Sequence, residues 1–211
     1  MLKEKRHYLD ISPSLSSNAG VFEGDTPYKL NTVMSFQKND NLMLSSIQMS
    51  VHAGAHADAP CHYHADGQSI ESRDLNYYMG DCQIIEIKTL MGGLITPELI
   101  SEEITSQRVL FKTGSYDYSG SFQTDFMAFA PETIKYLASK EVVLVGIDTP
   151  SIDPATSKDL KAHSKVYQHD MAILECLDLS QTTQKKYELI AIPMALPGAD
   201  ASPVRAILLE K

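Results

Sequence analysis

The sequence has 211 residues, no tryptophan and only three cysteines, Cys61, Cys82 and Cys176. Because the cysteines are odd in number and widely spaced, neither a disulfide framework nor a zinc site of paired cysteines is expected, and a reducing compartment fits. No apolar run approaches the roughly 18 residues that a membrane-spanning helix needs. The N-terminal residues also lack the apolar core of a secretory signal. We therefore expect a cytoplasmic protein that does not bind membranes.

The chain also has few basic residues relative to acidic ones, with a formal net charge of -9. An acidic surface repels phosphate backbones, so a nucleic-acid partner is not expected. Internal repeats, low-complexity tracts and linkers are absent, and the apolar fraction of 43% is typical of a globular protein. The sequence therefore predicts one domain over residues 1–211.

Hydrophobic patterning predicts a mixture of strands and helices. Strands are expected at 8–11, 42–51, 83–88, 108–112, 142–147, 189–193 and 206–209. Helices are expected to begin at Thr96-Pro97-Glu98 and at Ala130-Pro131-Glu132, where proline occupies a first helical position and an acid follows. This order indicates an α/β or α+β fold with a mixed sheet, and it does not give the strand order.

A cluster of histidines is the most informative feature of the chain. Four of the seven histidines, with one aspartate, lie in the segment HAGAHADAPCHYH, which runs from His52 to His64. Imidazole nitrogens and carboxylate oxygens bind zinc at about 2.0–2.2 Å. Since the intervening residues are almost all small, the backbone can approach an ion closely. The segment predicts a metal site around His52, His56 and Asp58, although manganese or iron also suits these ligands. A chance grouping of surface or core histidines is the competing interpretation.

The backbone must bend if these side chains are to share one ion. At about 3.3 Å per residue, a straight strand would separate His52 from His56 by roughly 13 Å. A helix would bring positions four apart together, but Pro60 opposes a continuing helix and Gly54 permits a bend. We expect a strand that ends near Val51, followed by a tight loop that turns the ligands inward.

Two weaker candidates lie far downstream. His163 alone is more simply a structural residue. Glu175 stands in the apolar run AILECL at 172–177, where its carboxylate faces solvent or is buried with a partner. A buried carboxylate is unfavourable unless it is paired or binds a metal. The residues by themselves leave both interpretations open.

The histidine motif resembles the signature of the metal-dependent cyclase-like hydrolases. It reads His52-x-Gly54-x-His56-x-Asp58-x-Pro60-x-His62. The chain is similar to the bacterial-type kynurenine formamidases of this family over nearly its whole length. Further matching stretches are 24–27, 65–67, 146–154, 157–160, 162–163, 172–175, 187–191 and 200–206. Of these, 146–154 and 200–206 point to the formamidase branch.

The resemblance implies a compact α/β domain with the swivelling β/β/α fold, a homodimer with its site close to the interface, and two zinc ions. By this resemblance, His52, His56 and Asp58 hold the first zinc and Asp58 bridges to the second. His163 binds the second zinc, and Glu175 contacts both. Manganese or another divalent ion is the alternative metal.

The resemblance further implies an arylformamidase, a metal-dependent amidohydrolase of tryptophan degradation. A zinc-activated hydroxide would cleave N-formyl-L-kynurenine to L-kynurenine and formate. His62 would donate and accept the proton, and the alternative is that it is a third metal ligand. Phe22 stands where the family has tryptophan, and it would stack on the kynurenine ring.

Several departures from the family pattern concern the substrate more than the metal. Phe22-Glu23 replaces the usual Trp-Pro, Ala55 replaces threonine, and His64 stands where aspartate is common. A hydrolase of isatin or a related cyclic amide is therefore an alternative. A non-catalytic metal-binding protein is a second one. A serine hydrolase is not indicated, because the Gly-x-Ser-x-Gly elbow is missing.

Overall fold

The computed structural model of the protein describes residues 7–17, 19–88, 92–118 and 120–210. Within these ranges, nine strands form one sheet in the order β1-β13-β11-β5-β7-β9-β10-β4-β12. They are β1 (Tyr8–Asp10), β4 (His56–Asp58), β5 (Met79–Glu86), β7 (Arg108–Lys112), β9 (Leu144–Ile147), β10 (Ala172–Glu175), β11 (Lys186–Ile190), β12 (Ala201–Pro203) and β13 (Ile207–Glu210). Strands β5, β7, β9 and β10 pair in parallel, and the remaining pairings in the sheet are antiparallel. The predicted α/β class with a mixed sheet is confirmed.

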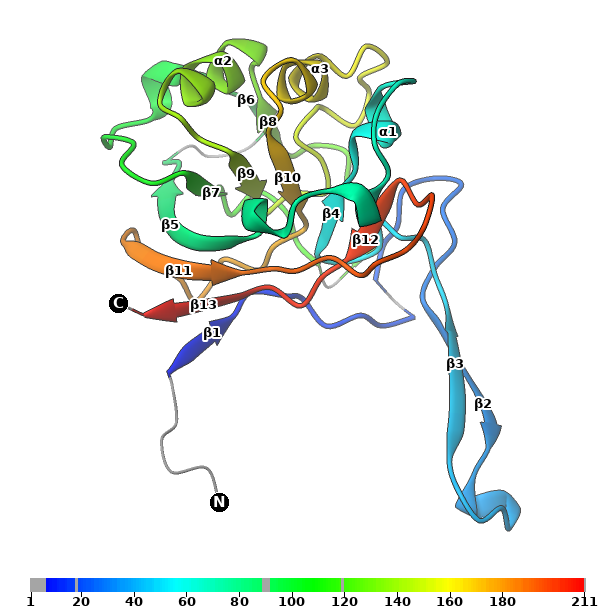
Figure 1. Cartoon of the computed structure of the whole chain (residues 1–211). Coiled ribbons are helices and arrows are strands. Elements are labelled where there is room, and N and C mark those ends of the chain that lie inside the picture. The colour runs from blue at the N-terminus through cyan, green and yellow to red at the C-terminus, as the bar shows by residue number, and fades with distance from the viewer. Residues whose placement is uncertain (1–6, 18, 89–91, 119, 211) are drawn as a thin grey trace.

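Shorter elements complete the fold. Strands β6 (Gly93–Ile95) and β8 (Met127–Phe129) pair in parallel, and β2 (Lys29–Met34) and β3 (Leu44–Gln48) form a hairpin. The α-helices are α1 (Pro60–Tyr63), α2 (Pro131–Ser139) and α3 (Lys161–Gln168), and the 3₁₀ helices are η1 (Phe36–Lys38), η2 (Ile70–Ser72), η3 (Leu75–Tyr77) and η4 (Pro97–Leu99). Helices α2 and α3 contact each other and cover one side of the sheet, away from β1, β11 and β13 (Figure 1).

Alternation along the central strands divides their side chains between two hydrophobic cores. Leu110 of β7 packs in one core with Ile84 of β5 and Leu174 of β10. Its neighbours Val109 and Phe111 face the other core, to which α2 and α3 contribute Ile134, Leu137, Ala162 and Val166. Since both faces of these strands are covered, their sequences are almost continuously apolar. This rigid centre supports β4 and β10, the strands that carry the site.

Both predicted helix starts are confirmed, but the helices that follow differ in length. Helix α2 begins at Pro131, directly after Ala130, as expected. The segment after Thr96 forms only the single turn η4. The irregular segment that follows is bound by Gln83 of β5, whose side chain donates to the carbonyl of Glu103 and accepts from the backbone N–H of Thr105. These hydrogen bonds replace the ones that a longer helix would have made.

The hairpin of β2 and β3 projects from the body of the molecule (Figure 1). The predicted strand at 42–51 corresponds to β3, yet its apolar side chains lie outside both cores. Ile47 is 60% exposed, and Leu30, its cross-strand neighbour, is 52% exposed. Phe36, in the connecting turn, is 66% exposed.

The remaining expectations from composition concern cysteine and membranes. Cys61, Cys82 and Cys176 are free, which agrees with the prediction of no disulfide framework. No helix in the described ranges has the length and apolar character needed to cross a bilayer.

Candidate active site

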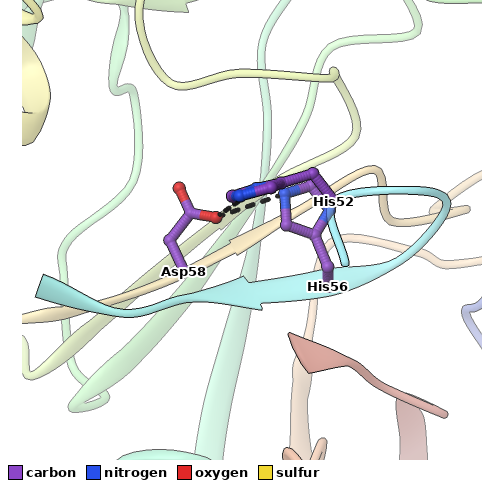
Figure 2. A group of neighbouring side chains, drawn as sticks. All are labelled: His52, His56 and Asp58. Carbon is purple, nitrogen blue, oxygen red and sulfur yellow. Dashed lines mark ion pairs between the residues drawn. The ribbon is translucent and has the colours of Figure 1, made fainter. Parts of the chain in front are cut away.

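A bend in the chain brings the first three predicted metal ligands together. His56 and Asp58 are two positions apart on β4 and therefore project from the same face, while His52 reaches them from the preceding loop (Figure 2). Gly54 has φ +71°, and a Cβ at this position would lie 2.5 Å from the side chain of Leu15. Only glycine fits this bend without strain. The bend predicted at Gly54 is therefore confirmed, although His56 and Asp58 lie on a strand instead of in the loop.

The carboxylate of Asp58 lies at the centre of the cluster. Its Oδ1 atom lies 3.1 Å from Nδ1 of His52 and 3.3 Å from Nε2 of His56. Its Oδ2 atom lies 3.3 Å from Nε2 of His163, which is in the first turn of α3. One oxygen of Asp58 thus faces His52 and His56, and the other faces His163.

Glu175 reaches the same cluster from β10. Its Oε2 atom lies 3.3 Å from Nε2 of His56, and its Oε1 atom lies 3.6 Å from Nε2 of His163. Antiparallel pairing of β10 with β4 sets Glu175 opposite His56. Glu175 is only 3% exposed, so the buried interpretation is correct. Two groups of potential metal ligands result. The first contains His52, His56 and Asp58, and the second contains Asp58, His163 and Glu175.

In each of the three histidine rings, the nitrogen that faces away from Asp58 lies within hydrogen-bonding distance of another acceptor. Nδ1 of His56 donates to the carbonyl of Gly54 at 2.8 Å. Nδ1 of His163 lies 2.7 Å from Oδ2 of Asp153, and Nε2 of His52 lies 3.0 Å from Oδ2 of Asp200. Such outer acceptors fix the tautomer and orientation of metal-binding histidines. In all three rings the remaining nitrogen faces Asp58.

The donor set fits divalent cations. Because Nδ1 of His56 carries the proton given to Gly54, Nε2 presents a lone pair toward Oδ1 of Asp58. Both of these atoms are buried and have no hydrogen-bond partner among the described residues. Two facing acceptors repel each other unless positive charge lies between them, and imidazole with carboxylate is a typical zinc ligand set.

In the absence of an ion, the histidines themselves would have to carry the positive charge that faces these carboxylates. Burial alone would lower the pKa of His56 and raise that of Asp58, but the attraction between the two side chains, 3.3 Å apart, outweighs burial. The pKa of His56 is held well above its usual value, and that of Asp58 well below. For His163, burial is outweighed by hydrogen bonds to Asp153 and Asp58, which raise the pKa to about 10. The site therefore favours ionised carboxylates with compensating positive charge among them.

His62 lies beside this cluster on α1. Its ring centroid is 4.3 Å from that of His52 and 6.1 Å from that of His163, and its side chain is 34% exposed. Nδ1 of His62 lies 3.3 Å from Oδ2 of Asp200. The group His52, His62 and Asp200 is also compact enough to hold an ion. Both predicted roles of His62, proton transfer and metal binding, are therefore compatible with its position.

A cleft of about 240 Å³ opens over the cluster and contains an aromatic wall. Phe22 lies in this wall, with its ring 5.2 Å from Phe122 in an edge-to-face contact, and Phe126 lines the cleft nearby. Sequence reasoning assigned no role to Phe122, Phe126, Asp153 or Asp200. Asp153 and Asp200 lie in the stretches 146–154 and 200–206, which carry the family resemblance, and that resemblance is the sequence feature that could have identified them as site residues.

Comparison with known proteins places this site in a family. Residues 9–154 match the Cyclase family, described as "Putative cyclase". The kynurenine formamidase of Bordetella pertussis is 44% identical over 203 residues, which cover 95% of this chain and 97% of that protein. A solved structure described as a potential metal-dependent hydrolase with cyclase activity has a TM-score of 0.84 at 27% identity, and the match covers 98% of this chain and 99% of that chain.

A third comparison concerns the fold alone. Isatin hydrolase A from Labrenzia aggregata has a TM-score of 0.82 over 96% of this chain and 93% of its own, at 20% identity. The mixed sheet and its helices therefore correspond to the expected cyclase-like fold. Since the family match spans more than half of the chain and the formamidase likeness nearly all of it, the protein belongs to the Cyclase family of metal-dependent hydrolases, in the group of the bacterial kynurenine formamidases.

Proposed function

We propose that the protein hydrolyses N-formyl-L-kynurenine to L-kynurenine and formate. The observation that carries this proposal is the 44% identity to a kynurenine formamidase over 95% of the chain, combined with a cleft above two groups of potential metal ligands. Cleavage of an aryl formamide needs a nucleophile at the formyl carbon and a proton for the departing amine. The cleft offers groups suited to both tasks.

The proposed cofactor is zinc, with two ions per subunit, and manganese is the alternative. His52, His56 and Asp58 hold the first ion, and Asp58, His163 and Glu175 hold the second. The compact grouping of their ligand atoms supports this assignment. When bound, such ions make water nucleophilic near neutral pH and stabilise negative charge that develops on the formyl oxygen.

His62 is the proposed proton donor and acceptor. Its Nδ1 atom is engaged by Asp200, so Nε2 is the nitrogen left for proton transfer. His62 takes a proton from the attacking water and returns it to the amine nitrogen as the C–N bond breaks. Phe22 orients the substrate by stacking on the kynurenine ring, and its edge-to-face contact with Phe122 holds it at the cleft.

The proposed biological unit is a cytoplasmic homodimer of one-domain subunits, residues 1–211, that acts in tryptophan degradation. Support for the dimer comes from the projecting hairpin, on which Leu30, Val33, Phe36, Leu44 and Ile47 are all at least 49% exposed. A two-stranded hairpin is marginally stable by itself, and an exposed apolar arm indicates a covering partner. A second copy of the chain is the partner that we propose.

Isatin or a related cyclic amide is the second candidate substrate. It is favoured by the fold-level likeness to isatin hydrolase and by Phe22-Glu23, which alters the usual substrate loop. Both substrates contain an amide next to an aromatic ring, so the same metal ligands serve either one. Assaying both compounds on one preparation distinguishes them.

The first experiment measures formate release from N-formyl-L-kynurenine by the zinc-loaded protein, after chelation and with His62→Ala. Turnover that both treatments abolish supports the proposal, provided that His62→Ala still binds two zinc ions. Loss of zinc from His62→Ala would make His62 a ligand instead. His64→Ala is a matched control, because His64 does not line the cleft. Its ring stacks on that of Tyr167, with 3.7 Å between the ring centroids. Turnover of isatin without turnover of the formamide would overturn the substrate assignment.

A further inference from the structure

Asp200 contacts two histidines of the site through a single oxygen atom. Its Oδ2 atom lies 3.0 Å from Nε2 of His52 and 3.3 Å from Nδ1 of His62. His52 offers its other nitrogen to Asp58, so it belongs to the metal cluster. His62 belongs to the cleft, where it is the proposed proton carrier. One carboxylate oxygen therefore joins a metal ligand to the group that handles the proton.

The backbone around Asp200 is fixed to the segment that carries these histidines. The carbonyl of Asp200 accepts a hydrogen bond from the backbone N–H of Ala59 at 2.9 Å. The next residue, Ala201, begins β12 and pairs with Asp58 of β4. The preceding carbonyl, that of Ala199, accepts from the N–H of Ile70 at 3.0 Å. Asp200 is thus held in register with β4 and with the start of α1.

We propose that Asp200 is a positioning residue that sets the rings of His52 and His62 together. This inference rests on the proposed function of His62. Because a carboxylate accepts and does not donate, the nitrogen of each ring that faces it carries the proton. Nδ1 of His52 then faces the metal cluster with its lone pair, and Nε2 of His62 faces the substrate.

The exposure of Asp200 predicts where its effect will be seen. The side chain is 49% exposed, so an ion pair there contributes little to folding. Outer-shell partners of metal-site histidines, in contrast, typically affect activity or metal affinity by about 10–100-fold. Removal of the Asp200 carboxylate is therefore expected to change catalysis far more than stability.

The test is a double-mutant cycle of Asp200→Ala and His62→Ala in zinc-saturated protein, with kcat, KM and zinc content measured for each variant. Asp200→Ala is expected to lower kcat by about 10–100-fold while KM and the bound zinc stay near wild type. In the His62→Ala background, the same change is expected to lower kcat less than about threefold, because residues that act as a unit are not additive. Asp66→Ala, an exposed carboxylate four residues after His62, is the matched control.

A second measurement does not depend on activity. Long-range ¹H–¹⁵N NMR spectra report which nitrogen of His62 is protonated, and we expect the Nδ1–H tautomer in the wild type and a changed ratio in Asp200→Ala. Equal losses of kcat in both backgrounds, or an unchanged tautomer, would overturn the inference. A third zinc ion that the wild type binds and Asp200→Ala lacks would overturn it too, by making Asp200 a ligand of an ion shared with His52 and His62. If the wild type hydrolyses no formamide, the proposed function fails, while the tautomer still decides the role of Asp200.

Discussion

Replacement of Asp153 by asparagine tests how the second ligand group is held. Asp153 is 2% exposed. Its carboxylate accepts hydrogen bonds from the backbone N–H of Ala162 at 3.1 Å, from that of His163 at 3.0 Å, and from Nδ1 of His163 at 2.7 Å. It therefore caps the start of α3 and orients the ring of His163 at the same time. Asparagine has the same shape but offers one acceptor oxygen in place of two.

The expected magnitude follows from these contacts. In the Asp153→Asn variant, at least one of these buried donors must face the new amide nitrogen, which cannot accept its hydrogen bond. An unsatisfied buried donor costs about 1–3 kcal/mol. For a chain of this size, 1 kcal/mol corresponds to roughly 2–4 °C in Tm, so the metal-free variant should melt about 2–12 °C lower. Loss of the carboxylate that orients His163 should also weaken the binding of the proposed second zinc ion by about 10–100-fold.

Two assays measure these effects separately. Calorimetric melting in the presence of a chelator gives the stability of the metal-free fold, and zinc titration against a competing chelator gives the affinity of each proposed zinc site. Asp159→Asn is the control, since this carboxylate lies four residues before His163 but is 72% exposed. A Tm and zinc affinities equal to those of the control would refute the assigned role of Asp153.

Three further predictions concern the metal, the hairpin and pH. Chelation should lower Tm, because zinc at 100 times its Kd stabilises the folded state by about 2.7 kcal/mol; equal melting curves with and without chelator would contradict the metal site. Ile47→Lys should convert the proposed dimer to a monomer in size-exclusion chromatography with light scattering, whereas Gln181→Lys, at an exposed position outside the hairpin, should not; an unchanged mass for Ile47→Lys would remove the hairpin from the interface. Burial disfavours ionisation of Asp170, but hydrogen bonds from Arg73 and Tyr77 outweigh it and lower its pKa. Above the unfolded carboxyl pKa near 3.9, Asp170→Asn should therefore be about 1 kcal/mol less stable than the wild type. This difference in the free energy of unfolding should vanish as pH falls through the lowered pKa of the folded state. Denaturant melts across acidic pH would show a constant difference if the pairing were irrelevant.

Local sequence patterns were sufficient to predict the first group of potential metal ligands. His52, His56 and Asp58 lie within seven residues, with small spacers and a glycine at the bend, so their convergence depends on short-range geometry. The α/β class was likewise predicted from the hydrophobic periodicity of the segments, and helix α2 from Pro131 at its first position. The helix that begins after Thr96 is only one turn long, and the backbone that follows it forms hydrogen bonds with the side chain of Gln83 in β5.

The second group of potential metal ligands depends on contacts between segments that are far apart in the sequence. Glu175 meets His56 because β10 pairs antiparallel with β4, and His163 reaches Asp58 across 105 positions of sequence. The residues alone left both His163 and Glu175 ambiguous, and the family resemblance was needed to select them. No local period encodes such a contact, since it is made by the order of strands in the sheet.

The sequence by itself determined the kind of chemistry, because ligand type and close spacing are properties of a short segment. Only the tertiary structure decided how each ring is oriented and what surrounds it. Asp153 and Asp200 are ordinary acids in the sequence, and they become acceptors for His163 and His52 only once the chain has folded. The exposed face of β3 is a further example, because its alternation predicts a strand but cannot say whether this chain or another covers it.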